Sequence, residues 1–245
     1  MELRRTFDEV AELYERARPE YPPEAIAWLV ERLSIREDST VLDLGAGTGK
    51  LTRALTPYAR RVIAVEPGPK MLAELRRAVP EAEAAVGTAE AIPLPDASVD
   101  AVLCGQAFHW FDQAAALPEL HRVLRRGGGL GLIWNLRDPD DELQKLVSEL
   151  IAPFVPAGRP PMPTSVAGLV EATAFGEVTC RVFSFEHELD ADGVAARVGS
   201  ISFVAAADER RRRGVERELR ELVARHGGVV AFRYRTEAYV TFSVG

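Results

Sequence analysis

The chain has 245 residues, of which 47% are hydrophobic and 27% charged, and its formal net charge is −7. This apolar content is enough for a buried core and excludes disordered, collagen-like and low-complexity chains. Nucleic acids and anionic membranes repel an acidic protein, so neither is expected as a partner. The sequence shows no signal-peptide pattern and no run of about 20 apolar residues, which predicts a cytoplasmic protein without membrane spans.

Amphipathic spacing predicts two helices at the start of the chain. Apolar residues recur at helical intervals in 7–17 and again in 25–33. An apolar run at 40–44, a glycine cluster, a helix-compatible stretch at 50–55 and a second apolar run at 62–65 follow. Strand, glycine turn, helix and strand in this order form a βαβ unit.

The same alternation continues further along the chain and predicts a mostly parallel sheet. The next elements expected are a helix near 69–78, strands near 84–86, 99–104 and 130–134, and a helix from the capping residue Asp112 to the glycine triplet 127–129. Residues 137–175 form a Pro-rich insertion with a helix near 142–151. Strands near 178–185 and 239–242 complete the sheet.

The helix expected at 208–225 contains four consecutive arginines, at 210–213. Its apolar stripe and its i,i+4 Glu/Arg pairs favour a solvated helix face over a phosphate-binding patch. Cys104 and Cys180 lie in strand-like runs without metal-ligand spacing, which predicts two reduced, buried thiols. No His or carboxylate motif indicates a metal site.

Gly45, Gly47 and Gly49 form a G-x-G-x-G turn between the first strand and its helix. Such a turn lets a ligand approach the backbone without meeting a Cβ atom. A dinucleotide fingerprint would require glycine where Lys50 stands, which disfavours an NAD(P)-dependent oxidoreductase. Glu66 ends the next strand, where its carboxylate can accept hydrogen bonds from both hydroxyls of a ribose.

Residues 38–136 resemble the class I, Rossmann-like S-adenosylmethionine-dependent methyltransferases. Four ordered blocks carry the resemblance: V-L-D-L-G-A-G-T-G at 41–49, Glu66, the block at 87–100, and R-V-L-R-R-G-G at 122–128. The resemblance implies S-adenosylmethionine as the cofactor and S-adenosylhomocysteine as its product. It also implies an α/β fold with a seven-stranded, mostly parallel sheet, helices on both faces, an antiparallel last strand and a helical cap over the active site.

The family pattern, carried over by position, implies a cofactor site. The implied contacts are Asp43, Gly45, Ala46, Gly47 and Gly49 to the methionyl part, Glu66 to the ribose, Met71 to one adenine face, and Thr88, Ala89 and Glu90 to the adenine edge. The family often has Asp where Thr88 stands. Either the Thr88 hydroxyl or the Glu90 carboxylate would therefore accept a hydrogen bond from the adenine amine.

A shorter resemblance links residues 14–22 and 106–112 to the trans-aconitate methyltransferase group of this family. It implies that Tyr14 and Arg18 face the methionyl carboxylate or the acceptor, and that Gln106 lies beside the cofactor. The substrate side would be lined by Tyr21, Phe108, His109 and Trp110.

Methyl transfer is an in-line displacement that needs alignment and exclusion of water rather than a covalent nucleophile. A carboxylate acceptor is ionised at neutral pH and needs no base, whereas an alcohol or ammonium acceptor needs one. His109 is the candidate catalytic base. The alternative is a ring packed between Phe108 and Trp110 that orients the loop.

The sequence therefore predicts a methyltransferase acting on a small molecule, as a monomer or homodimer. A carboxylic acid is the first choice of acceptor, with Arg18, Arg137 and Arg159 as candidate carboxylate clamps. An amine, a phenol or a quinone-ring carbon stays open as acceptor. Two other classes also stay open, an NAD(P)-dependent oxidoreductase and a non-catalytic cofactor-binding protein.

We expect residues 1–245 to form a single methyltransferase domain. Its predicted parts are N-terminal cap helices at 1–37, a cofactor-binding core at 38–136, a cap insertion at 137–175, and C-terminal strands and helices at 176–245.

Overall fold

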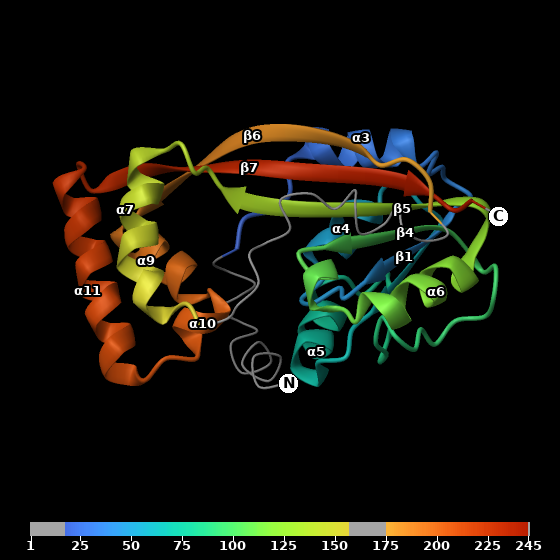
Figure 1. Ribbon diagram of the computed structural model, residues 1–245, viewed down its shortest axis with the longest axis horizontal. Helices are drawn as coiled ribbons and strands as arrows, with labels where there is room; N and C mark the ends of the chain where they lie inside the picture. The colour runs from blue at the N-terminus through green and yellow to red at the C-terminus, as the bar shows by residue number, and fades with distance from the viewer. Residues whose placement is uncertain (1–17, 157–174, 245) are drawn as a thin grey trace. The chain divides into compact units, whose positions relative to one another are not determined.

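The computed structural model describes residues 18–156 and 175–244. Seven strands form one sheet in the order β3-β2-β1-β4-β5-β7-β6 (Figure 1). The sheet is mostly parallel, and the last strand of the chain, β7, is inserted antiparallel between β5 and β6. The predicted fold class is confirmed. The first predicted helix, over residues 7–17, lies outside the described residues.

Backbone contacts divide the chain into two compact units. The described part of the larger unit is 20–135, 175–183 and 236–244, and that of the smaller unit is 18–19, 136–156 and 184–235. The elements up to the fifth strand are α3 (Pro23–Arg32), β1 (Thr40–Leu44), α4 (Lys50–Leu55), β2 (Arg61–Val65), α5 (Pro69–Ala78), β3 (Glu83–Ala85), β4 (Val99–Gly105), η1 (Phe108–Trp110), α6 (Gln113–Val123) and β5 (Leu124–Arg137). The later elements are α7 (Glu142–Ile151), η2 (Ala152–Phe154), β6 (Thr179–Asp190), α9 (Ala191–Gly199), α10 (Ser202–Ala205), α11 (Glu209–Arg225) and β7 (Val229–Phe242).

The parallel strands bring their carboxyl ends to one edge of the sheet. β1 pairs with β2 and β4, with Leu44 opposite Val65 and Asp43 opposite Leu103. These short strands are almost entirely apolar and buried, as expected for parallel strands covered on both faces. The segments that follow β1, β2 and β4 therefore meet at this edge, which is where ligands bind in open parallel sheets.

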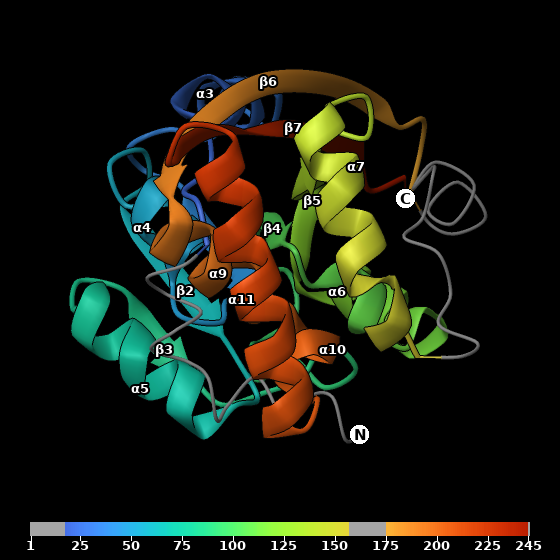
Figure 2. The same ribbon diagram turned by 90° about the vertical axis from the view of Figure 1, so that its left-hand side faces the viewer.

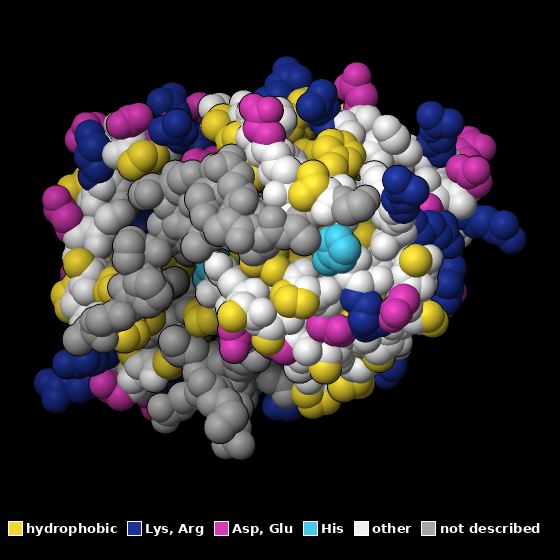
Figure 3. Space-filling model, turned by 45° about the vertical axis from the view of Figure 1, so that its right-hand side comes forward, with side chains coloured by type: hydrophobic (Ala, Val, Ile, Leu, Met, Phe, Trp, Pro, Cys, Tyr) yellow, Lys and Arg dark blue, Asp and Glu magenta, His cyan; other side chains and the backbone are white. Residues whose placement is uncertain are grey.

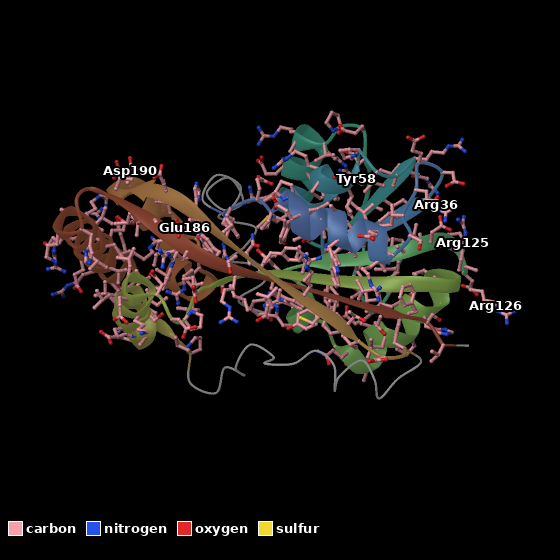
Figure 4. The ribbon with its side chains drawn as sticks, turned by 90° about the horizontal axis from the view of Figure 1, so that it is seen from above. Arg36, Tyr58, Arg125, Arg126, Glu186 and Asp190 are labelled. Carbon is pink, nitrogen blue, oxygen red and sulfur yellow. The ribbon has the colours of Figure 1, made fainter. Side chains whose placement is uncertain are left out.

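Helix α6 begins as predicted but ends earlier than predicted. The Asp112 side chain caps it by accepting a hydrogen bond from the Ala114 N–H, and the last helical residue is Val123. The expectation that the helix runs on to the glycine triplet is wrong, because Leu124 is extended and pairs with Val99. Arg125 and Arg126 therefore project from the start of β5 (Figure 4), where Arg125 Nη1 donates to Asp100 Oδ1 over 2.6 Å.

The last two strands are longer than the sequence pattern predicts. β7 begins at Val229 rather than near 239, and side chains in its first half are alternately buried and exposed. β6 forms an edge of the sheet, and its first four residues are exposed. Cys104 is buried as expected, but the prediction of a buried thiol is wrong for Cys180, which is exposed on this edge strand.

The smaller unit has a hydrophobic core of its own. Helices α7, α9 and α11 lie side by side (Figure 2), and their buried side chains pack with those of β7. The stripe of α11 is buried as predicted at Val215, Leu219, Leu222 and Val223. Glu209 pairs with Arg213, and Glu216 lies 3.8 Å from Arg220, which confirms the solvated face.

Helix α7 has the bounds predicted for it. No helix in the described ranges is long and apolar enough to span a membrane. Residues 157–174 of the predicted cap insertion lie outside the description, and its position over the active site stays a prediction.

Candidate active site

The glycine turn between β1 and α4 has a left-handed backbone at each of its three glycines. The φ angles are +70° at Gly45, +57° at Gly47 and +93° at Gly49, a region that L side chains rarely adopt. A Cβ atom at Gly45 would lie 2.7 Å from Ala107 Cβ, whereas one at Gly47 would meet no atom of the described residues within 4 Å. Gly47 therefore leaves open space beside the backbone, as the predicted ligand site requires.

Gly49 has an additional reason to be glycine. A Cβ atom there would lie 2.9 Å from Leu75 Cγ and 3.2 Å from Val79 Cγ2. Helix α5 and the residue after it thus pack directly against this end of the turn. The contact of Gly49 with a cofactor stays a prediction.

Glu66 follows β2 and joins the turn to the next loop. Its Oε2 accepts a hydrogen bond from the Gly47 N–H over 2.9 Å, and its Oε1 accepts one from the Gly68 N–H over 2.8 Å. An ionised carboxylate accepts hydrogen bonds at both of its oxygens. The two backbone donors therefore orient the Glu66 carboxylate beside the glycine turn.

Asp43 is completely buried at the end of β1. Its Oδ2 accepts a hydrogen bond from Thr52 Oγ1 over 2.6 Å, and its Oδ1 has no hydrogen-bond partner among the residues described. Burial and, to a smaller extent, the negative charge of Glu66 together raise the pKa of the Asp43 carboxyl to about 7. A buried acceptor without a donor is costly, so Asp43 suits a site that a cationic ligand completes.

The residues predicted to contact the adenine have two kinds of surroundings in the structure. Met71 on α5 and Ala89 are both buried. Thr88, the residue before Ala89, forms an isolated antiparallel bridge with Ala91. Glu90 Oε1 accepts a hydrogen bond from the Asp112 N–H over 2.9 Å and so supports the start of α6. One Glu90 oxygen is thus already used within the protein, and the choice between Thr88 and Glu90 for the adenine amine stays a prediction.

Gln106, directly after β4, has a strained backbone. Its φ of +58° is uncommon for a residue other than glycine, and such strain clusters at functional sites. The Gln106 N–H donates to the Ile133 carbonyl over 2.9 Å, and Nε2 donates to the Asn135 carbonyl over 3.0 Å. These bonds connect the end of β4 to β5 at the carboxyl edge of the parallel strands.

Asn135 was not predicted as a site residue. It is buried, its Nδ2 donates to the Glu20 carbonyl over 3.1 Å, and its Oδ1 accepts from Thr236 Oγ1 over 2.7 Å. The network thus links β5 to β7 and to the segment before α3. The only signal for Asn135 in the local sequence is that its amide side chain directly follows the apolar run 130–134.

Tyr21 lies at the same edge. A Cβ atom at Gly105, the last residue of β4, would lie 2.5 Å from the Tyr21 hydroxyl oxygen. The missing side chain at Gly105 thus makes room for the Tyr21 ring. This neighbourhood agrees with the predicted substrate-side position of Tyr21, although its role stays a prediction.

His109 contacts Trp134 of β5 through one ring nitrogen. Trp134 Nε1 donates to His109 Nδ1 over 3.3 Å, so a neutral His109 carries its proton on Nε2. The lone pair that a base would use is therefore engaged, which favours the orienting interpretation. The neighbouring Trp110 ring lies 4.9 Å from the His109 ring, and Phe108 is fully buried against Phe111.

The remaining predicted residues fall elsewhere. Arg18 belongs to the smaller unit, where its Nη2 donates to the Ser200 carbonyl over 3.2 Å. Arg137 also belongs to the smaller unit. Tyr14 and Arg159 lie outside the described residues. The described part of the chain contains no group of three or more His, Cys, Asp or Glu residues that could hold a metal.

A family model described as a methyltransferase domain matches residues 42–132, the region that contains this site. A methyltransferase-like protein of Schizosaccharomyces pombe is 38% identical over 223 residues, covering 89% of this chain and 86% of that protein. This chain belongs to the methyltransferase family.

Further relatives resemble the first half of the chain. An uncharacterized methyltransferase of Mycobacterium tuberculosis is 57% identical over 133 residues. The match covers 54% of this chain and 53% of that protein, so it spans about half the length of each. The trans-aconitate 2-methyltransferase of Azoarcus is 35% identical over 130 residues, which cover 51% of this chain and 50% of that enzyme.

Solved structures support the fold. A candidate type II methyltransferase of Anaeromyxobacter dehalogenans has a TM-score of 0.68 and 28% identity, covering 93% of this chain and 97% of that one. The YcgJ protein of Bacillus subtilis, at 20% identity and a TM-score of 0.58, shares the fold over 91% of this chain and 99% of its own.

Proposed function

We propose that the protein transfers the methyl group of S-adenosylmethionine to a small-molecule acceptor. The observation that carries this proposal is the Glu66 carboxylate, held by the N–H groups of Gly47 and Gly68 beside a left-handed glycine turn with open space. When bound, the cofactor supplies an electrophilic methyl group on a sulfonium sulfur.

The residues of the larger unit fit this cofactor. Glu66 would bind the two ribose hydroxyls, and the open backbone at Gly47 would lie against the methionyl part. Asp43 provides a buried oxygen without a donor, and a cationic group beside it favours its ionised form. Gln106 and the Asn135 network would hold the edge rigid, which aligns the acceptor for in-line attack.

A carboxylic acid is our first choice of acceptor. The Azoarcus relative is named for methylation of trans-aconitate, and a carboxylate needs no base. This agrees with a His109 whose Nδ1 already accepts from Trp134. On the face shown in Figure 3, basic side chains are interspersed with acidic ones, which supports a small molecule rather than a nucleic acid. An amine or phenol remains the alternative and would need His109 as base.

Two measurements test the proposal. Calorimetric titration should show binding of S-adenosylhomocysteine and none of NADH. Methyl transfer from labelled S-adenosylmethionine to a panel of small acids, amines and phenols should then give product with the acids first. Binding of NADH without binding of S-adenosylhomocysteine contradicts the proposed cofactor, and binding without turnover on any acceptor contradicts the proposed activity.

A further inference from the structure

The smaller unit contains two arginines, Arg137 and Arg197, that pair with no carboxylate of the described residues. Arg197, on α9, is 3% exposed, and Arg137, at the end of β5, is half-buried. In each of them Nη1 is buried and has no hydrogen-bond partner among the described residues. No carboxylate of the described ranges pairs with either guanidinium. Buried charges are normally paired, so this arrangement is unusual.

The described arginines that do have carboxylate partners are more exposed than Arg197. Arg61 donates to Glu83 over 2.6 Å, and Arg233 of β7 donates to Glu186 of β6 over 2.8 Å. Their side chains are 46% and 53% exposed. These exposed arginines therefore have carboxylate partners, whereas the deeply buried Arg197 has none among the residues that the structure describes.

Tyr234 of β7 holds Arg197 in place without neutralising it. Arg197 Nε donates to the Tyr234 hydroxyl over 2.7 Å, and the guanidinium carbon lies 5.5 Å from the centre of the Tyr234 ring. That ring stacks on Phe185 at 4.9 Å. Arg197 is therefore fixed by a rigid aromatic pair, which leaves its Nη1 atom for another acceptor.

The two arginines also act on each other. Burial and, to a smaller extent, the positive charge of Arg197 together lower the pKa of the Arg137 guanidinium to about 10. The backbone relates the same two segments, because the Asp138 N–H donates to the Arg233 carbonyl over 3.2 Å, and Arg137 and Tyr234 are the sequence neighbours of these residues. Two like charges near each other favour binding of an anion. Arg18 adds a third guanidinium at the end of α9, where it donates to the Ser200 carbonyl.

We infer that Arg137 and Arg197 bind an oxyanion group, a carboxylate or a phosphate, of a small-molecule ligand. A planar guanidinium matches such oxygens with paired N–H donors, and Arg is suited to sites of this kind. Identifying the ligand with the methyl acceptor rests on the proposed function, whereas the anion site itself does not.

The test measures anion binding in the full-length protein without cofactor. Malonate and inorganic phosphate are titrated separately while the melting temperature is followed, with chloride at matched ionic strength as the reference. A saturable rise with malonate alone assigns a carboxylate, and one with phosphate alone assigns a phosphate. No rise above chloride with either anion overturns the proposal, as expected if the chain supplies its own counter-charge.

Substitutions locate the site. Arg137→Met and Arg197→Met should each weaken the apparent affinity about tenfold or more, the effect expected for one lost charge-assisted hydrogen bond. Without anion, Arg137→Met should melt at or above the wild-type temperature, because it removes a buried unpaired charge. Arg126→Met, at an exposed arginine, is the matched control and should bind like the wild type. Wild-type anion affinity in both Arg137→Met and Arg197→Met overturns the assignment.

The wild-type titration does not depend on how well the variants fold, and Arg137→Lys provides a charge-retaining second variant. Titration of S-adenosylhomocysteine on the same samples separates the two proposals. If the wild type does not bind S-adenosylhomocysteine, the proposed function is contradicted, whereas the result of the anion titration still stands.

Discussion

Replacing Glu66 with alanine removes the two hydrogen bonds that tie the glycine turn to the loop after β2. The Gly47 and Gly68 N–H groups lose acceptors at 2.9 Å and 2.8 Å. Glu66 is half-buried, so water can partly replace the carboxylate, and we expect a loss of about 1–2 kcal/mol in the free energy of unfolding. The fold should survive, because the strands on either side are buried in the sheet.

Glu66→Ala should also weaken cofactor binding, because water does not fully replace the hydrogen bonds that the ribose hydroxyls would donate to the carboxylate. Losing hydrogen bonds from ribose hydroxyls to a charged acceptor costs roughly 1.5–3 kcal/mol. At about 1.4 kcal/mol for each factor of ten, the dissociation constant of S-adenosylhomocysteine should rise roughly 10- to 150-fold. The Gly47 segment also loses its anchor, which adds disorder at the same place.

Calorimetric titration of S-adenosylhomocysteine measures this change directly. Glu83→Ala is the matched control, because Glu83 lies on the neighbouring strand β3 and pairs with exposed Arg61. It should keep the wild-type dissociation constant. If Glu66→Ala lowers the melting temperature but leaves the dissociation constant within about twofold of the wild type, the carboxylate only supports the turn and the ribose assignment fails.

Three other predictions concern the same unit. Burial raises the pKa of Asp43 from the ordinary aspartate value of 3.8 to about 7 in the folded protein. The folded state therefore binds the proton more tightly than the unfolded state, and Asp43 makes the free energy of unfolding fall as pH rises between these values. Urea unfolding at several pH values should show a shallower fall for Asp43→Asn, and parallel curves would contradict the assignment. His109→Phe should keep activity on a carboxylic acid acceptor within about tenfold, since proton transfer is not required, and should cost about 1 kcal/mol of stability because Trp134 Nε1 loses its acceptor. A fall of several orders of magnitude in kcat with intact cofactor affinity would instead identify His109 as a base. Gly47→Ala and Gly127→Ala both place a Cβ at positive φ in open space, so each should lose about 1 kcal/mol of stability. Only Gly47→Ala should weaken S-adenosylhomocysteine binding in calorimetry, and equal affinities would contradict a ligand at Gly47.

Local sequence patterns predicted the structure most accurately where the conformation of a short segment depends on its own residues. The bounds of β1, the glycine turn and the cap at Asp112 were all predicted, because hydrophobic runs, positive φ and capping depend on neighbouring residues. The end of α6 was mispredicted for the opposite reason. The helix stops at Val123 because Leu124 pairs with Val99, a partner that local sequence does not reveal.

What the sequence determined by itself was the order of elements, the family resemblance and the placement of Glu66 after a strand beside a glycine turn. What only the tertiary structure decided was which polar groups meet. Asn135 reaches Thr236 across about a hundred residues of chain, and Arg197 is buried with no carboxylate partner in the described ranges. Burial removes water as a partner, so the energy of a polar group depends on neighbours that only the fold brings together.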